Sequence, residues 1–190
     1  MDQFAVGVIE IAYAIASLAL ISAGLALVFG MMRVINLAHG EFIVLGGYAT
    51  IVATKAGINI WVSMLIVAPL AVGLIGLLVE RLIIRWLYGR MVDTMLATWG
   101  LSLLLVGLIT TIFGNTVTGV ANPIGPVRIG SYQVGGYALF IIAISVLLML
   151  AIYGVLRHTR LGLVARGAMQ NADIVSGLGY DPSRIYMATF

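Results

Sequence analysis

The stretch IAYAIASLALISAGLALVFG, residues 11–30, is one long apolar run without a charged residue. Each residue of an α-helix adds about 1.5 Å of length, so roughly 20 apolar residues cross the roughly 30 Å hydrocarbon core of a bilayer. The run lacks the alternation of apolar and polar residues that is typical of a barrel strand. It therefore predicts a transmembrane helix.

Similar uncharged runs recur outward from this stretch. Of all residues 62% are hydrophobic and 9% are charged, whereas a soluble domain is about a quarter charged. The sequence predicts an all-α integral membrane protein, a polytopic helix bundle forming one domain over residues 1–190. We expect further spans at residues 61–79, 94–113 and 137–156, a non-helical connection at 114–136, and an apolar segment at 185–190 where the next span would begin.

Basic residues indicate the orientation of the spans. Lys55 and Arg128 stand alone in their loops, and the first run lacks the basic flank of a signal peptide. By the positive-inside rule the arginine-rich loops face the cytoplasm, which places the N-terminus outside. The first of these loops is a charged stretch, predicted to be a loop or surface helix, with Glu80, Arg81, Arg85, Arg90 and Asp93; the second carries Arg157, Arg160, Arg166 and Arg184.

The second span is unusual because its apolar part, residues 42–54, is too short to cross a bilayer alone. A full crossing must begin near Val34 and include Asn36, His39, Gly40 and Glu41. Such polar residues are costly in lipid and usually face a cavity, a pathway or another subunit. Alternatively, Asn36 caps the helix and Glu41 lies in its first turn at the membrane interface. The two interpretations are compatible.

The composition excludes several functions. The chain has no cysteine, its two histidines, His39 and His158, are far apart, and its single lysine, Lys55, lies outside any nucleotide-binding loop. We therefore expect no metal or cofactor on this chain, and any ATPase must be a partner. No basic patch interleaved with aromatic residues suggests a nucleic-acid partner. A remote enzyme alternative is an intramembrane hydrolase that uses a buried serine and His39.

The polar segment at residues 157–184 contains apolar residues spaced among polar ones. It predicts short amphipathic helices on the cytoplasmic surface, ended by Gly177 and Gly179. An ordinary loop, held on anionic membrane lipid by its arginines, is the structural alternative.

Three stretches carry a resemblance to a known family. GLALVFGMMRVINLAHGEFIVLGGYAT at residues 24–50 resembles the signature of permease subunits of branched-chain amino acid ABC importers, above all in the Asn-x-Ala-His-Gly-Glu core at 36–41. ATWGLSLLL at residues 97–105 and the segment from Thr159 to the end are similar to two further stretches of that family. The similarity covers nearly the whole chain.

The resemblance implies a bacterial inner-membrane importer whose pathway this chain lines with a second, related permease subunit. Two cytoplasmic ABC ATPase subunits would hold ATP and Mg, and a periplasmic binding protein would deliver the substrate. Leucine, isoleucine and valine are the first expectation for that substrate. Urea or short-chain amides are the alternative, because Ala97–Gly100 also resembles that branch. Family members run on further, so the resemblance also implies that this chain is truncated at its C-terminus and would not transport alone.

The resemblance also suggests roles for two groups of residues. The candidates for the pathway or its gate are Asn36, His39, Gly40 and Glu41. The candidates for docking the ATPase, within residues 157–184, are Leu163, Arg166, Asn171, Ile174, Gly177, Leu178 and Gly179.

Overall fold

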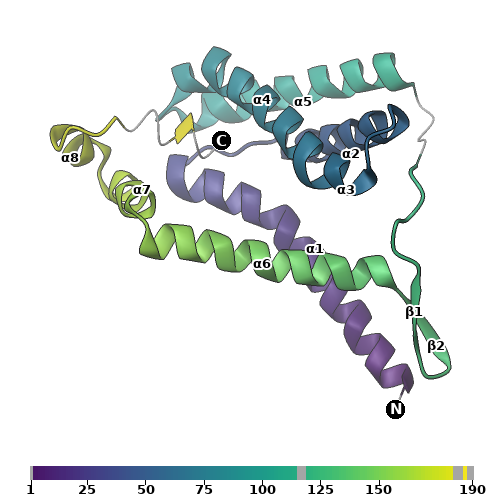
Figure 1. The fold of residues 1–190 in the computed structure, drawn as a ribbon. Helices are drawn as coiled ribbons and strands as arrows, with labels where there is room; N and C mark the ends of the chain where they lie inside the picture. Colours follow the sequence, from purple (N-terminus) through teal and green to yellow (C-terminus); the bar gives the residue numbers. More distant parts are fainter. Residues whose placement is uncertain (1, 115–118, 182–185, 188–190) are drawn as a thin grey trace.

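The computed structural model describes residues 2–114, 119–181 and 186–187. Within them the chain is almost entirely helical (Figure 1). The helical elements are α1 (Asp2–Met32), α2 (His39–Lys55), α3 (Ile60–Val62), η1 (Ser63–Val67), α4 (Ala68–Leu82), η2 (Ile84–Leu87), α5 (Met91–Phe113), α6 (Gly136–His158), α7 (Arg160–Gln170) and α8 (Ala172–Gly177). The strands are β1 (Pro126–Ile129) and β2 (Tyr132–Gly135).

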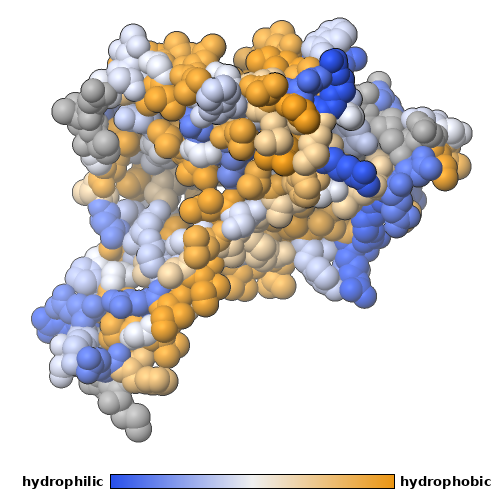
Figure 2. Space-filling view, turned by 180° about the vertical axis from the view of Figure 1, so that it is seen from behind, coloured by the Kyte–Doolittle hydropathy of each residue, from blue (hydrophilic) through white to orange (hydrophobic). Residues whose placement is uncertain are grey.

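Four helical stretches are long and apolar enough to cross a membrane: Gln3–Met32, Ile60–Leu82, Met91–Phe113 and Gly136–His158. They confirm four of the predicted spans, and each helix runs beyond the predicted limits into more polar sequence. Apolar side chains cover much of the surface (Figure 2), as expected where lipid rather than water is the solvent. The chain is thus a polytopic helical membrane protein. The predicted apolar segment at 185–190 lies outside the described residues except for 186–187.

The helix from Ile60 to Leu82 contains one wide turn, the π-helical η1. The amide of Ala68 donates to the carbonyl of Ser63, five residues back. Pro69, at the start of α4, explains this turn, because proline has no N–H and its ring pushes away the carbonyl four residues earlier. The turn therefore has a local cause in the sequence.

The helices form two groups that meet at one core (Figure 1). In the first group α1 packs along α6; in the second α2 packs on α4 and α5. The core lies near the C-terminal end of α1, where residues from α1, α4 and α5 surround the connection into α2. Its buried members are Val28, Met32, Val34, Ala38, Phe42, Val79, Ile84, Leu101 and Leu105.

Contacts between distant segments show how the chain alternates between the two ends of the bundle. The C-terminal part of the connection into α6 is the β1–β2 hairpin, and β2 contacts α1. Trp61, at the start of α3, packs edge-on against Phe140 of early α6, with ring centroids 5.1 Å apart. At the opposite end, Met31 of α1 and Leu156 of α6 line one groove. Thus α1 and α6 run in the same direction, and α2 returns the chain to the hairpin end.

The connection at 114–136 is non-helical where it is described, as predicted, but its hairpin was not foreseen. β1 and β2 pair antiparallel, with Val127 opposite Val134, and Gly130 supplies the positive φ of 60° in the turn. The hairpin lies directly before α6 (Figure 1).

Candidate functional site

The connection between α1 and α2 is a non-helical turn at residues 33–38. Arg33, with a φ of 52°, takes the left-handed conformation that ends α1. The prediction of a crossing helix that begins near Val34 is wrong, because α2 begins only at His39 and has 17 residues. The helix is about 25 Å long at 1.5 Å per residue. The reason is that residues 33–38 bond to other helices instead of forming their own helical ladder.

Asn36 is buried but does not cap α2, contrary to the alternative prediction. The cap residue is Ala38, and it makes no side-chain capping bond. The Oδ1 atom of Asn36 instead accepts the amide of Ala38 at 3.0 Å, which closes a short turn just before the helix. Asn36 therefore stabilises the connection and leaves the helix N-terminus open.

Side-chain hydrogen bonds hold the start of α2 against two long helices, α1 and α5. His39 bonds to the carbonyl of Ile21, which is about 16 Å along α1 from the end of that helix at Met32. Glu41 bonds to Ser102, which is about 16 Å along α5 from Met91. The start of α2 therefore lies beside the middle of both long helices. Glu41 lies in the first turn of α2, as predicted, and the location of that turn at the membrane interface stays a prediction.

Thr98 of α5 supplies the bonds that a broken helix needs inside a membrane. Its side chain is fully buried. The hydroxyl accepts the amide of Leu37 at 3.1 Å, and its proton can go to the carbonyl of Ile35 at 3.1 Å or to its own helix. Irregular backbone is tolerated at this depth only where protein groups satisfy it. The two motifs at 36–41 and 97–105 are thus the two sides of one contact.

The Glu41 carboxyl is held on one oxygen only. The hydroxyl of Ser102 donates to Oε1 at 2.7 Å. The second oxygen, Oε2, is buried and has no hydrogen-bond partner among the described residues. A buried, half-satisfied carboxyl costs free energy and is expected at a functional position rather than at a purely structural one.

His39 joins the start of α2 to α1. Its Nε2 atom lies 2.8 Å from the carbonyl oxygen of Ile21 and donates to it in the tautomer with the proton on Nε2. The ring packs on Gly24, where an added Cβ would lie 2.9 Å from His39 Cε1. Gly40, the next residue, is exposed with open space around it. His39 is bonded to a backbone carbonyl and Ser102 to a carboxyl, which speaks against a Ser–His pair.

The predicted amphipathic helices of the 157–184 segment are α7 and α8; residues 182–184 lie outside the described part. Leu163, Ile174 and Leu178 are exposed by 64%, 63% and 72%. The side chain of Asn171 accepts the amide of Ile174 at 3.2 Å at the start of α8. Gly177 is the last residue of α8, and Gly179 follows with a φ of 86°. The segment therefore presents apolar side chains outward.

Arg166 differs from the other docking candidates because it points back to the bundle. Its Nη1 atom donates to the carbonyl of Leu156, near the end of α6. This contact ties Arg166 to α6, whereas the side chains of Leu163 and Leu178 are mostly exposed.

One buried acid was missed by sequence reasoning. Glu80, expected in a surface loop or surface helix, is 1% exposed at the end of α4. The hydroxyl of Tyr88 donates to its Oε1, and Oε2 has no partner among the described residues. Burial, followed by this hydrogen bond, raises the pKa of Tyr88 far above its usual range. The sequence showed only that Glu80 lies in a run of charged residues, and such runs are usually exposed to solvent.

The family model and the relatives that match this chain agree with each other. Residues 7–190 match the family described as branched-chain amino acid transport system / permease component. The permease protein LivH of the high-affinity branched-chain amino acid transport system, from Salmonella typhimurium and from Escherichia coli K12, is 27% identical over 189 residues. The alignment covers 90% of this chain and 61% of each relative, so the chain spans about three fifths of their length. No solved structure matches. The chain belongs to the family of permease components of branched-chain amino acid transport systems.

Proposed function

We propose that the chain is a permease subunit of an ABC importer in the bacterial inner membrane and forms part of the pathway for leucine, isoleucine and valine. The observation that carries this proposal, beyond family membership, is the polar start of α2. There Asn36 is buried and His39 and Glu41 are half-buried among apolar helices, and one carboxylate oxygen of Glu41 has no partner among the described residues. Membrane transporters use such broken helices and polar groups along their substrate pathways.

The proposed partners follow from the resemblance to ABC importers. They are a second related permease, two cytoplasmic ABC ATPases that hold ATP and Mg, and a periplasmic binding protein. The exposed leucines and isoleucine of α7 and α8 support a docking role for this segment, because apolar side chains on a cytoplasmic surface favour burial against a partner. We further propose that residues 1–190 belong to one permease domain.

The proposed orientation places the N-terminus and the β1–β2 hairpin outside and α7 and α8 inside. The contacts that put β2 beside α1, and α7 beside the far end of α1, agree with this parity. The proposed orientation also places the arginine-rich loops on the cytoplasmic side.

The deciding experiment is ATP-dependent uptake by the full-length protein, reconstituted with its partner subunits in vesicles. Labelled leucine should accumulate, excess isoleucine or valine should compete, and urea and acetamide should not. Competition by urea or acetamide instead would show that the substrate is urea or a short-chain amide. Uptake that proceeds without ATP or without the ATPase subunits would refute an ABC importer.

The role of the polar α2 start is tested by Glu41→Gln, which keeps the shape of the side chain and removes its charge. We expect a strong loss of leucine uptake while the permease still co-purifies with the ATPase. Thr111→Ala, which removes a hydroxyl bonded only to its own helix at Gly107 O, 2.7 Å away, is the control. Normal uptake by Glu41→Gln would remove this carboxyl from the pathway.

A further inference from the structure

The junction between α6 and α7 is unusually tight. α6 ends at His158 and α7 begins at Arg160, so only Thr159 separates the two helices. The hydroxyl of Thr159 accepts the amide of Gly162 at 3.1 Å and caps α7. The same hydroxyl donates to the carbonyl of Val155 at 2.6 Å. One side chain thus joins the start of α7 to the last turns of α6.

Gly162 allows α7 to approach the backbone of α6. A Cβ atom at this position would lie 2.3 Å from the carbonyl oxygen of Leu156 and 2.4 Å from that of Val155. Both neighbours are backbone atoms, which cannot move aside as a flexible side chain can. Any other residue would therefore push α7 away from α6.

Arg166 closes the junction one turn further along α7. Its guanidinium donates to the carbonyl of Leu156. Carbonyls in the last turn of a helix lack partners within the helix, and a cation is favoured there. Thr159, Gly162 and Arg166, named here the α6–α7 elbow, thus use the free end of α6 to hold α7.

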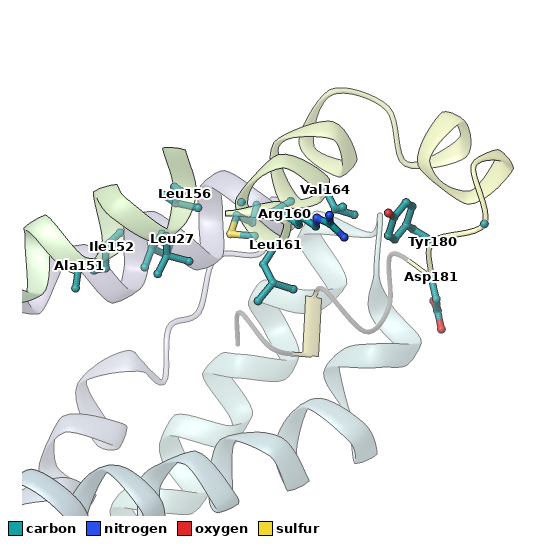
Figure 3. A pocket seen from close by; sticks show the side chains of 14 residues that line it. Leu27, Ala151, Ile152, Leu156, Arg160, Leu161, Val164, Tyr180 and Asp181 are labelled. Carbon is teal, nitrogen blue, oxygen red and sulfur yellow. The ribbon is translucent and has the colours of Figure 1, made fainter. Parts of the chain in front are cut away.

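α7 borders two cavities and packs on its neighbours through small residues. On one side lies a groove of about 850 Å³, formed by α1, α6, α7 and residues 179–181 (Figure 3). A second cavity of about 410 Å³, between α1, α6 and α7, is lined in part by Arg166 and Met169. Between them α7 rests on small buried residues, Gly162, Ala165 and Ala168. The elbow adds to this packing the directed hydrogen bonds that join α7 to the end of α6.

From the elbow, contacts continue to the polar start of α2. Ser145 of α6 is buried, and its hydroxyl donates to the carbonyl of Ala16 in α1 at 3.1 Å. About one and a half turns along α1, the carbonyl of Ile21 receives His39. A series of contacts thus runs from α6 through α1 to the start of α2.

We propose that the α6–α7 elbow is the positioning device that makes the docking segment move as one body with α6 and α1. The inference rests on the proposed function and adds to it the residues that transmit the motion of the ATPases. Thr159, Gly162 and Arg166 are positioning residues: they contact neither substrate nor nucleotide in this scheme. Rigid transmission is what a two-state transport cycle driven from outside the bundle requires.

The geometry is tested by distance measurement between spin labels. Residues 1–190 contain no cysteine. A Leu150→Cys, Gln170→Cys double variant of the full-length protein, with any cysteine outside these residues replaced by serine, carries labels at two exposed positions, on α6 and at the end of α7. We expect one narrow distance distribution. Arg166→Met and Gly162→Ala should broaden or shift it, and Arg166→Lys should restore it in part. Arg160→Met, which removes the same charge from α7 without breaking an elbow bond, should leave it unchanged.

The coupling is tested in the reconstituted transporter by measuring ATP hydrolysis and leucine uptake together. Arg166→Met and Gly162→Ala should keep the ATPase bound and hydrolysing, while leucine taken up per ATP falls. For Arg166→Met, which loses a charged hydrogen bond, we expect a fall of about tenfold. Gly154→Ala, at an α6 glycine with open space around it, is the matched control for Gly162→Ala.

The outcomes separate the two proposals. If the wild-type transporter shows no ATP-dependent uptake, the proposed function itself fails. If the wild type transports and both elbow variants keep its distance distribution and its uptake per ATP, the elbow inference is overturned. It is also overturned if both variants lose the ATPase on purification, because the residues would then act in docking itself.

Discussion

At the scale of single residues, the main feature is a set of polar contacts between helices far apart in sequence. Ser102 bonds Glu41, Thr98 bonds Leu37, and His39 bonds Ile21. Each contact satisfies a group that lipid could not. Among the described residues the exceptions are one carboxyl oxygen each of Glu41 and Glu80 and the hydroxyl of Ser63, which have no partner.

Ser102→Ala should destabilise the protein, since it leaves both oxygens of the Glu41 carboxyl without a partner. An unsatisfied buried polar group costs about 1–3 kcal/mol. The measurement is the thermal unfolding midpoint in detergent, and the expected result is a lower midpoint than in the wild type. Thr111→Ala on the same helix should unfold near the wild-type temperature. An unchanged midpoint in Ser102→Ala would show that the bond contributes nothing.

Gly24→Ala should weaken the joint between α1 and α2, because the new Cβ would lie 2.9 Å from the His39 ring. The ring must move, and its bond to Ile21 is lost. A double-mutant cycle measures this coupling: once His39→Ala is present, Gly24→Ala should cause little further loss of thermal stability. Gly7→Ala, at an α1 glycine with open space, is the control. Additive losses would contradict the contact.

Tyr88→Phe should lower stability at neutral pH by about 1–3 kcal/mol, because Glu80 loses its donor. The raised pKa of Tyr88 also gives a pH dependence. Above the usual tyrosine pKa near 10 the unfolded chain releases this proton and the folded protein keeps it, so stability falls as pH rises. Alkaline unfolding of wild type against Tyr88→Phe should show this component only in the wild type. Tyr132→Phe, at an exposed hairpin tyrosine, should behave as the wild type does.

At the scale of elements, the helices that depart from regular geometry are those around the polar turn. α2 is shortened by its non-helical connection, and the Ile60–Leu82 helix is widened at η1 ahead of Pro69. Both departures have identifiable causes: external bonds to residues 33–38 in the first case and a missing amide in the second. α2 contacts η1, so the two irregular elements pack on each other.

Two buried serines give a paired prediction, because only one of them has a hydrogen-bond partner for its hydroxyl among the described residues. Ser63 in η1 is fully buried, and its hydroxyl has no partner among the described residues. Ser145 in α6 bonds α1. Ser63→Ala should therefore keep or raise the unfolding midpoint, because an unpaired hydroxyl is removed. Ser145→Ala should lower stability by about 0.6 kcal/mol, a typical value for a bond between membrane helices. The reverse order would contradict both assignments.

At the scale of the whole molecule, α1 and α6 run in parallel and α2, despite its 17 residues, brings the chain back to the hairpin end. The turn at 33–38 makes this possible by carrying the chain from the end of α1 to the depth at which α2 begins. The bundle is loosely closed around α7, where the two cavities lie.

Accessibility labelling of single cysteines tests the proposed orientation. In intact cells with a permeable outer membrane, an impermeant maleimide should label Lys55→Cys and Tyr132→Cys. It should label Arg90→Cys and Arg160→Cys only after the inner membrane is opened. Residues 1–190 contain no cysteine, so no background residue within them needs removal. Labelling of Arg160→Cys from outside would reverse the topology and place α7 away from any cytoplasmic ATPase.

The sequence by itself determined that the chain lies in lipid and where its four long apolar helices run. Apolar runs near 20 residues, without charges, are sufficient to specify helices in lipid, because the backbone must satisfy its own hydrogen bonds there. The unusual polar stretch at 36–41 and the amphipathic helices after Arg157 were also visible as local patterns.

Only the tertiary structure decided where those polar groups lie and what they bond. The partners of Glu41 and of Leu37 are each 61 residues away along the chain, and a local pattern carries no information about a contact at that separation. For the same reason Asn36 was misplaced as a helix cap and Glu80 as a surface charge. Burial depends on which helices meet, and that is settled when the whole bundle packs.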